Sequence, residues 1–346
     1  MNKSSLQQRV LWVDYAKGIG IFLVVLGHTI GGLIGSSILL KSSTPAIAVD
    51  RWIYAFHMPL FFFLAGLFLY RSASKPIKDF VVDKLKVIAY PYLVWSVLQT
   101  ILQAVGSRYT NNPTSLSDLW RIIYSPVEQF WFLYVLFVLV VVYAIARKLG
   151  VSNILFATGS ILFYSLQGYF GLGPWGVLYI VQKYAIYLGL GALIGNSKAL
   201  SLLQQQKTST LIVVTLGGFA IVALAVGLNL TEEKWWLPAI ALCGICASIA
   251  AAMLLERFNI AQFVEQWGRL SLEIYLAHTI ASATIRIVLQ KILGVTSPTA
   301  HIILVTAVGI YAPIALAMIC QRIGIKYMFA LRSQPSVAPK PLVASK

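Results

Sequence analysis

Long apolar segments recur along the whole chain, and they constrain the fold more than any other feature. Each is about as long as the 17–25 residues that a helix needs to cross a bilayer. The ten segments are residues 18–38, 52–70, 88–105, 130–146, 152–170, 174–195, 209–229, 236–255, 271–290 and 300–320. Because lipid offers the backbone no hydrogen bonds, the sequence predicts an all-α, polytopic integral membrane protein with about ten transmembrane helices.

Charged residues are scarce and unevenly placed. They make up 11% of the chain, against about 25% in soluble domains, which is too few to cover a soluble fold of this size. Of the 27 lysines and arginines, 19 fall in segments that are cytoplasmic if the N-terminus is, and 7 fall in the segments outside. This bias predicts that both termini are cytoplasmic. It also explains the net charge of +16 without a nucleic-acid partner.

The spans divide the chain into three regions. Residues 1–17 are predicted as a cytoplasmic N-terminal segment, and residues 18–322 as the membrane-embedded domain in contact with lipid. Residues 323–346 are predicted as a cytoplasmic tail, partly disordered because it is rich in proline and serine.

Ionisable side chains in the first span are candidates for function, because placing them in a bilayer is costly. Lys17 and His28 are eleven residues apart and project from one face of a helix. The rise between them is roughly 16 Å, which places His28 near the middle of the bilayer if Lys17 lies at its cytoplasmic boundary. Asp14 extends the same stripe. We favour a functional role for His28, whereas an anchoring role at the interface stays open for Asp14 and Lys17.

Two further histidines are predicted at a similar depth. His57 lies roughly 8 Å inside the outer boundary of the second span, beside Pro59, which weakens the helix there. Tyr275 and His278 share a face of the ninth span, with His278 roughly 12 Å from its cytoplasmic end. We therefore expect these histidines to converge with His28. No metal is predicted, because no carboxylate shares their depth. A histidine at an interfacial kink remains the alternative for His57.

A carboxylate and an indole stand before the fourth span. Glu128 and Trp131 at the outer mouth can hold a sugar by hydrogen bonds and by stacking on its apolar face. Trp131 also fits the aromatic belt of a membrane interface, which explains Glu128 poorly.

Basic residues gather on the inside after the second span, among them Arg71, Lys84 and Lys86. They can bind an anionic cytosolic ligand such as the phosphates of coenzyme A. The positive-inside bias alone produces the same pattern, so both interpretations stay open.

Three motifs together make the chain resemble the acyltransferase type 3 family, and its fucose 4-O-acetylase-like branch in particular, over about residues 9 to 320. The first is Asp14-Tyr-Ala-Lys17-Gly followed by His28, and it meets the family's pattern of a basic residue, ten positions and a histidine. The other two are Phe56-His57-Met58-Pro59-Leu60-Phe61-Phe62 and Phe130-Trp131-Phe132-Leu133. The family often has arginines before the third span, where this chain has Lys84 and Lys86; lysine is a weaker bidentate phosphate ligand.

The resemblance implies an O-acyltransferase of a cell (inner) membrane that moves an acetyl group from acetyl-CoA to a hydroxyl of a cell-surface polysaccharide or lipid-linked sugar. His28 is then the expected base, and His57 positions the acceptor or relays the proton. By the same resemblance, coenzyme A is expected to bind the inner charged residues Asp14, Lys17, Arg71, Lys84 and Lys86. The acceptor is expected to bind Glu128, Trp131, Tyr275 and His278. Direct transfer and an acetyl-histidine intermediate both stay open.

Two other classes of function are compatible with buried histidines. A proton-coupled transporter or flippase of a glycan precursor can use them as a relay, although we find no broken helices at matching places in two halves of the chain. A membrane sensor or scaffold has no need of them. The resemblance favours the enzyme.

Overall fold

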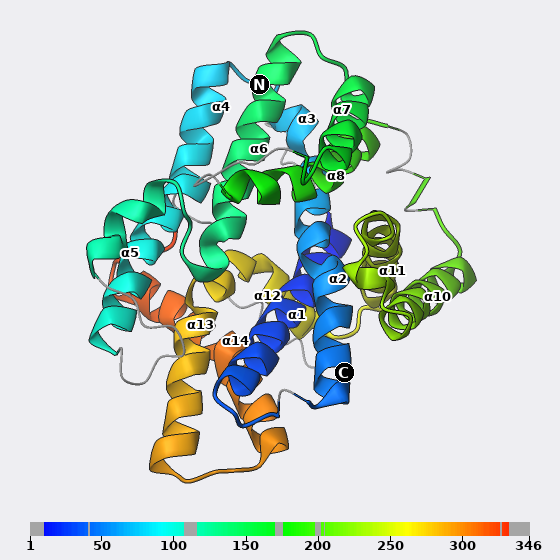
Figure 1. The fold of residues 1–346 in the computed structure, drawn as a ribbon. Helices are drawn as coiled ribbons and strands as arrows, with labels where there is room; N and C mark the ends of the chain where they lie inside the picture. Colours follow the sequence, from blue (N-terminus) through cyan, green and yellow to red (C-terminus); the bar gives the residue numbers. More distant parts are fainter. Residues whose placement is uncertain are drawn as a thin grey trace, which may run out of the picture.

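The computed structural model describes residues 10–40, 42–106, 116–169, 176–197, 202–203, 205–325 and 327–331, and over this part of the chain it consists of helices and turns without a strand (Figure 1). The elements are α1 (Leu11–Gly35), α2 (Thr44–Leu67), α3 (Leu69–Ser72), α4 (Ile77–Lys84), η1 (Leu85–Ala89), α5 (Tyr90–Val105), η2 (Leu116–Ile123), η3 (Glu128–Phe130), α6 (Trp131–Lys148), α7 (Asn153–Ser165), α8 (Val177–Gly195), α10 (Thr208–Gly227), η4 (Leu230–Glu232), α11 (Leu237–Phe258), α12 (Gln262–Arg269), α13 (Ser271–Ile287), η5 (Val288–Ile292) and α14 (Pro298–Arg322).

Nine helical segments among the described residues are long and apolar enough to cross a membrane, which confirms the polytopic fold. They are α1, α2, the continuous α4–η1–α5 unit, the segment from η2 into α6, α8, α10, α11, the α13–η5 unit and α14. The prediction differs most at 152–170, where α7 has only 13 residues. Its length of about 20 Å is less than the roughly 30 Å of a hydrocarbon core.

Contacts between α7 and α8 show that the two helices pack side by side. The Asn153 side-chain amide donates to the carbonyl of Ala192 near the end of α8, at 3.3 Å. The Gln167 amide, beyond the end of α7, donates to the carbonyl of Tyr179 near the start of α8, at 3.1 Å. The segment 153–167 therefore runs antiparallel to α8 along most of that helix.

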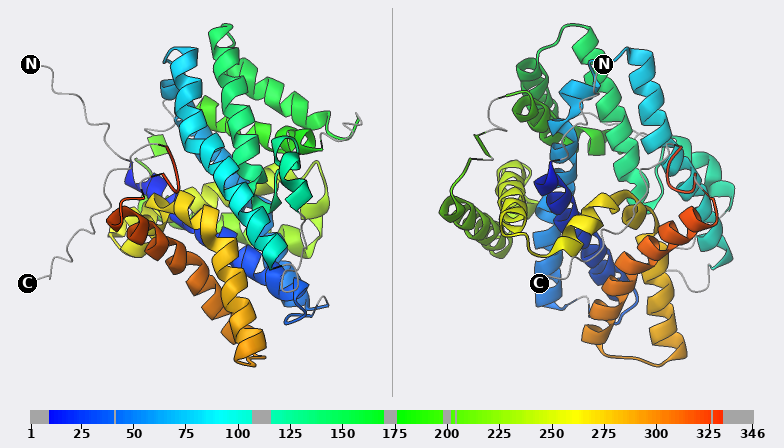
Figure 2. Two further views of the ribbon diagram at one scale, coloured as in Figure 1. Left: turned by 90° about the vertical axis from the view of Figure 1, so that its left-hand side faces the viewer. Right: turned by 180° about the vertical axis from the view of Figure 1, so that it is seen from behind.

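The first and the last long helix, α1 and α14, have their outermost chain ends on the same side of the bundle. Helices α1 and α14 pack antiparallel, with the Thr306 hydroxyl donating to the Thr29 hydroxyl at 3.3 Å. The beginning of α1 at Leu11 and the end of α14 at Arg322 therefore lie together, as Figure 2 shows in its left view. This arrangement agrees with an even number of crossings. Helix α1 also begins before residue 18, so Asp14 and Lys17 stand on the same helix as His28.

Close packing of α2 on α8 depends on two glycines. A Cβ atom on Gly66 would lie 2.3 Å from the carbonyl oxygen of Leu188, and one on Gly191 would lie 2.2 Å from that of Phe63. The backbones therefore touch, which is how membrane helices gain contacts where hydrophobic burial cannot drive association. This contact holds the helix that carries His57 against α8.

Helix α10 exposes much of its apolar surface, and Val213, Leu216 and Leu224 are each more than 60% exposed. Apolar side chains in such positions suit a hydrocarbon solvent rather than water.

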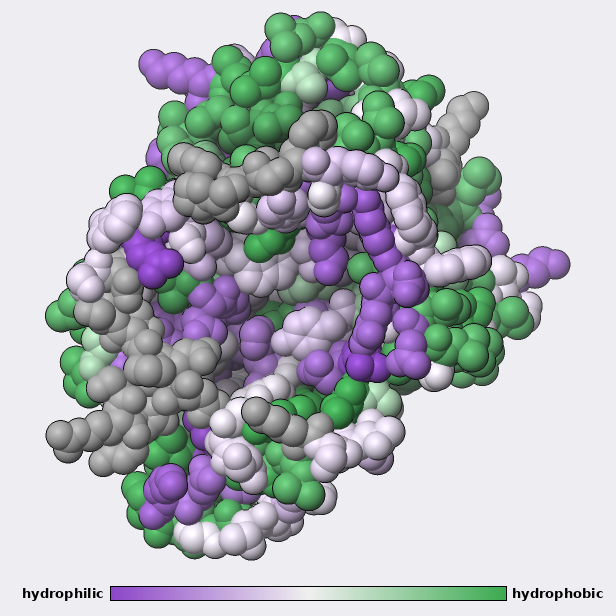
Figure 3. Space-filling model, viewed as in Figure 1, coloured by the Kyte–Doolittle hydropathy of each residue, from purple (hydrophilic) through white to green (hydrophobic). Residues whose placement is uncertain are grey.

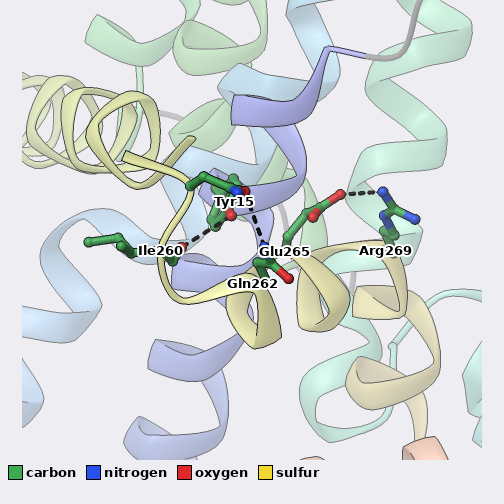
Figure 4. Close-up of polar contacts among 6 residues, drawn as sticks. Tyr15, Ile260, Gln262, Glu265 and Arg269 are labelled. Atoms are coloured by element: carbon green, nitrogen blue, oxygen red, sulfur yellow. Dashed lines mark hydrogen bonds and ion pairs between the residues drawn. The ribbon is translucent and has the colours of Figure 1, made fainter. Parts of the chain in front are cut away.

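The short helix α12 lies across the inner part of α1. The Tyr15 hydroxyl donates to the carbonyl of Ile260 at 3.1 Å, and Glu265 pairs with Arg269 on α12 (Figure 4). Asp14 is only 4% exposed in this contact.

The beginning of the predicted tail is packed rather than free. The Trp95 indole on α5 donates to the carbonyl of Met328 at 2.9 Å and stacks on Phe329 at 5.4 Å between ring centroids. Residues 332–346 of that tail lie outside the described residues.

Candidate active site

Two histidines from different helices meet inside the bundle. His28 on α1 and His278 on α13 have ring centroids 5.1 Å apart. His278 is fully buried, whereas His28 is partly open to a cavity. The expected convergence of these two residues is confirmed, although they are 250 positions apart in the sequence.

The surroundings of His278 determine which of its nitrogens is basic. Its Nδ1 lies 2.8 Å from the carbonyl of Tyr275 and 3.1 Å from that of Ile274. Carbonyl oxygens only accept hydrogen bonds, so Nδ1 must carry the hydrogen. The Nε2 atom then has a free lone pair, and it is buried without a hydrogen-bond partner among the described residues. A lone pair buried in this way is unusual, and it lies beside His28.

His57 stands one ring further from this pair. Its Nδ1 lies 2.7 Å from the carbonyl of Ile53, so by the same argument its Nε2 is the basic nitrogen. The Tyr54 ring lies 4.8 Å from the His57 ring and 6.5 Å from the His28 ring. The Tyr54 ring therefore contacts both histidine rings, and His57 itself does not line the cavity beside His28.

A cavity of about 780 Å³ opens from His28 toward the end of the bundle where α1 ends, which we call the outer cavity. Figure 3 shows hydrophilic residues gathered in a central hollow on the face that it views, with apolar residues over much of the periphery. The polar residues that line the outer cavity are His28, Thr29, Gln99, Gln103, Glu128, Gln129, Thr279, Ser282, Thr284, Arg286 and Lys291.

A network of amides and hydroxyls builds one wall of the outer cavity. The Gln129 side-chain amide donates to Gln99 Oε1 and to Thr279 Oγ1, both at 2.8 Å. The Thr279 hydroxyl donates to Gln99 Oε1 at 3.2 Å, and the Tyr275 hydroxyl donates to the Gln129 carbonyl. The network ties η3, α5 and α13 together. The sequence offered one signal for it, a glutamine inside the third apolar segment, but the partners lie 30 and 180 residues away.

A second, smaller cavity of about 150 Å³ approaches the histidines from the opposite end, and we call it the inner cavity. Its walls are almost entirely apolar: Ile21, Val24, Met58, Phe61, Val87, Ile88, Phe132, Leu133, Leu136, Ser271, Leu272 and Tyr275. Tyr275, whose ring centroid is 6.1 Å from that of His278, closes the inner cavity on the side of the histidines. The histidine pair and Tyr275 therefore form a layer between the two cavities.

The structure places Glu128 and Trp131, which were predicted to hold the acceptor together, in different surroundings. Glu128 lines the outer cavity, and its φ of 44° is a left-handed conformation that L-residues with side chains rarely adopt. Trp131 does not line that cavity. Its ring stacks on Tyr184 at 5.0 Å and lies 6.4 Å from Phe62, so it belongs to an aromatic cluster between α2, α6 and α8.

The predicted coenzyme A residues lie outside both cavities. Lys17 is half-buried on α1, and Arg71 is exposed at the end of α3. Lys84 ends α4 with its ammonium 5.2 Å from the Phe80 ring centroid, while the exposed Lys86 lies in the wide turn η1. Together with Asp14, they share the end of the bundle where α1 begins, but the structure does not gather them into one pocket.

Comparisons with known proteins place this geometry in context. A family model described as an acyltransferase domain matches residues 10–318. No curated protein and no solved structure matches the chain.

Proposed function

Because the chain belongs to the acyltransferase type 3 family, we propose that it is an O-acetyltransferase. In this proposal it moves an acetyl group from acetyl-CoA to a hydroxyl of a cell-surface polysaccharide or a lipid-linked sugar, at the cell (inner) membrane. The observation that carries the proposal is the His28–His278 pair, which stands between two cavities that approach it from opposite ends of the bundle.

The inner cavity suits the donor. Its volume of about 150 Å³ and its apolar walls fit an acetyl thioester with the adjoining part of its arm, but they offer a sugar few hydrogen bonds. The cations Lys17, Lys84 and Lys86 lie at the same end of the bundle, where they attract the phosphates of coenzyme A electrostatically. Acetyl-CoA therefore approaches the histidine layer from the cytoplasmic side.

The outer cavity suits the acceptor. It is about five times larger and is lined by the Gln99–Gln129–Thr279 network, whose oxygens and amides match the hydroxyls of a sugar. A polar acceptor on the far side of the membrane can thus reach His28 without crossing the bilayer.

The chemistry needs a base, because a sugar hydroxyl is a poor nucleophile. His28 takes the hydroxyl proton while the oxygen attacks the thioester carbonyl carbon. The carbon–sulfur bond then breaks, the acetyl group stays on the sugar oxygen, and coenzyme A leaves as a thiolate that takes up a proton. The unpartnered lone pair on His278 Nε2 lies beside the His28 ring, and in this mechanism it orients the base by accepting a hydrogen bond from that ring as the reaction proceeds. His57 is the proposed proton relay, since the Tyr54 ring contacts both it and His28.

The test uses membranes that contain the protein and acetyl-CoA labelled in the acetyl group. Alkali-labile label should appear in glycan or glycolipid with the wild type, and His28→Ala should lower its rate of appearance about 10²- to 10⁴-fold, the range attributed to a positioned base.

A matched control is His301→Gln. His301 is buried in α14 with Nε2 2.9 Å from the Val295 carbonyl, and it lines neither cavity, so its replacement should leave transfer nearly unchanged. Equal label from wild type and His28→Ala would remove His28 from the chemistry. If no variant, including the wild type, transfers label to acceptor-containing membranes, the O-acetyltransferase proposal fails and proton-coupled flux becomes the next measurement.

A further inference from the structure

Arg286 is a buried cation that the proposed reaction does not use. It lies near the end of α13, is 7% exposed and lines the outer cavity. No ion pair joins Arg286 to a carboxylate among the described residues, in contrast to Arg51, which pairs with Glu232, and Arg269, which pairs with Glu265. A charge held inside a membrane protein without a partner is costly, and such residues usually line a water-filled cavity or a substrate path.

Anchoring at the membrane interface does not account for this residue. An arginine that anchors a helix extends its guanidinium to lipid headgroups and is exposed there. Lys291, one turn further along, is exposed at the cavity rim and fits that role. Arg286 instead has its remaining accessible surface in the cavity.

The position of Arg286 relative to the histidines sets a distance. Arg286 and His278 are eight residues apart on one helix, which separates them by about 12 Å along its axis. Thr279 and Ser282 lie between them and also line the cavity. When the reacting hydroxyl of an acceptor lies at His28, another part of the same acceptor, farther from that hydroxyl, therefore lies beside Arg286. Glu128 is the single carboxylate among the described lining residues, against two cations.

From this arrangement, and on the premise of the proposed function, we propose that Arg286 binds an anionic group of the acceptor, a carboxylate or a phosphate, at a site remote from the hydroxyl that is acetylated. The planar guanidinium binds either group through two parallel hydrogen bonds, which fixes the acceptor's orientation in the cavity as well as its affinity. The acceptor is thus an acidic glycan or a sugar linked to a lipid phosphate.

The experiment measures the KM for acceptor, supplied as the glycan and glycolipid extract of producing cells. Arg286→Gln should raise this KM on the order of 10- to 100-fold, as expected for loss of a charge-assisted bidentate contact, and Arg286→Lys should raise it less. The KM for acetyl-CoA and its slow hydrolysis without acceptor should not change, which also reports that the variant is folded. The control is Arg322→Gln, an exposed arginine at the far end of α14, which should behave as wild type.

Two treatments of the extract distinguish the sources of charge. Reduction of carboxyl groups removes glycan carboxylates, and mild acid releases sugars from lipid phosphates. The treatment that removes the relevant charge should raise the acceptor KM of the wild type to that of Arg286→Gln. The same treatment should not raise the acceptor KM of Arg286→Gln any further. This comparison with wild-type protein decides the matter even if Arg286→Gln does not fold.

An unchanged acceptor KM in Arg286→Gln, or a wild-type KM that neither treatment alters, would overturn the inference. In both cases the wild type still transfers label, so the proposed O-acetyltransferase function stands. Absence of transfer by the wild type would instead overturn both.

Discussion

The two cavities differ in volume and in the polarity of their lining, although both end at the layer formed by the histidine pair and Tyr275. The outer cavity, about 780 Å³, combines apolar residues with amides, hydroxyls, a histidine, a carboxylate and two cations, whereas the inner cavity, about 150 Å³, is lined almost wholly by aliphatic and aromatic side chains. In the proposed function this difference separates the substrates: the wide side with polar groups would take the acceptor, and the narrow apolar side the acetyl group of the donor.

Closing the inner cavity should have the largest effect on transfer. Leu272 is half-buried in its wall, and Leu272→Trp would fill much of the space. Overpacking of a buried site costs about 1–3 kcal/mol in stability, which the bundle can tolerate. We expect kcat/KM for acetyl-CoA to fall at least about 100-fold, because a reacting group misplaced by about 1 Å already loses that much.

Leu216→Trp is the matched control, since Leu216 is 67% exposed on α10 and faces lipid. Binding of acceptor to the outer cavity should survive in Leu272→Trp. A variant that loses acceptor affinity and keeps its use of acetyl-CoA would reverse our assignment of the two cavities.

Replacing the second histidine should have an intermediate effect. His278→Gln keeps a polar side chain but removes the basic Nε2 that lies beside His28. In the proposed mechanism His278 orients the base and does not contact the reacting atoms, so kcat should fall about 10- to 100-fold, less than for the base itself, while both KM values stay close to wild type. Kinetics in reconstituted vesicles would measure this. A fall in kcat as large as that of His28→Ala would make His278 an equal candidate for the base.

The smallest effect concerns stability at the rim of the outer cavity. Glu128 has a φ of 44°, which costs an L-residue about 1 kcal/mol but not glycine. Glu128→Gly and Glu128→Ala both remove the carboxylate, so they differ only in backbone freedom. We expect the glycine variant to be the more stable by about 1 kcal/mol in thermal unfolding in micelles, with the same acceptor KM in both. Equal stabilities would show that the left-handed conformation is not kept in solution.

Much of the site could be predicted from the sequence, because its polar side chains are conspicuous within apolar segments. His28 and His278 stand out as ionisable groups in apolar helices, and estimates of depth from the helical rise bring them to the same level. Depth alone could not show that His28 lines the outer cavity and His57 does not, since that depends on the rotation of α2 about its own axis. Rotation likewise turns Trp131 toward Tyr184 and away from the cavity that Glu128 lines.

The sequence by itself determined the class of the protein, the approximate limits of most of its long helices and the identity of its unusual polar residues. These properties follow from local chemistry, because twenty consecutive apolar residues have few alternatives to a membrane helix. Only the tertiary structure decided which of those residues meet. The pairing of His28 with His278, the Gln99–Gln129–Thr279 network and the burial of Arg286 depend on helix order and rotation, which contacts between backbones such as those at Gly66 and Gly191 establish across distant parts of the chain.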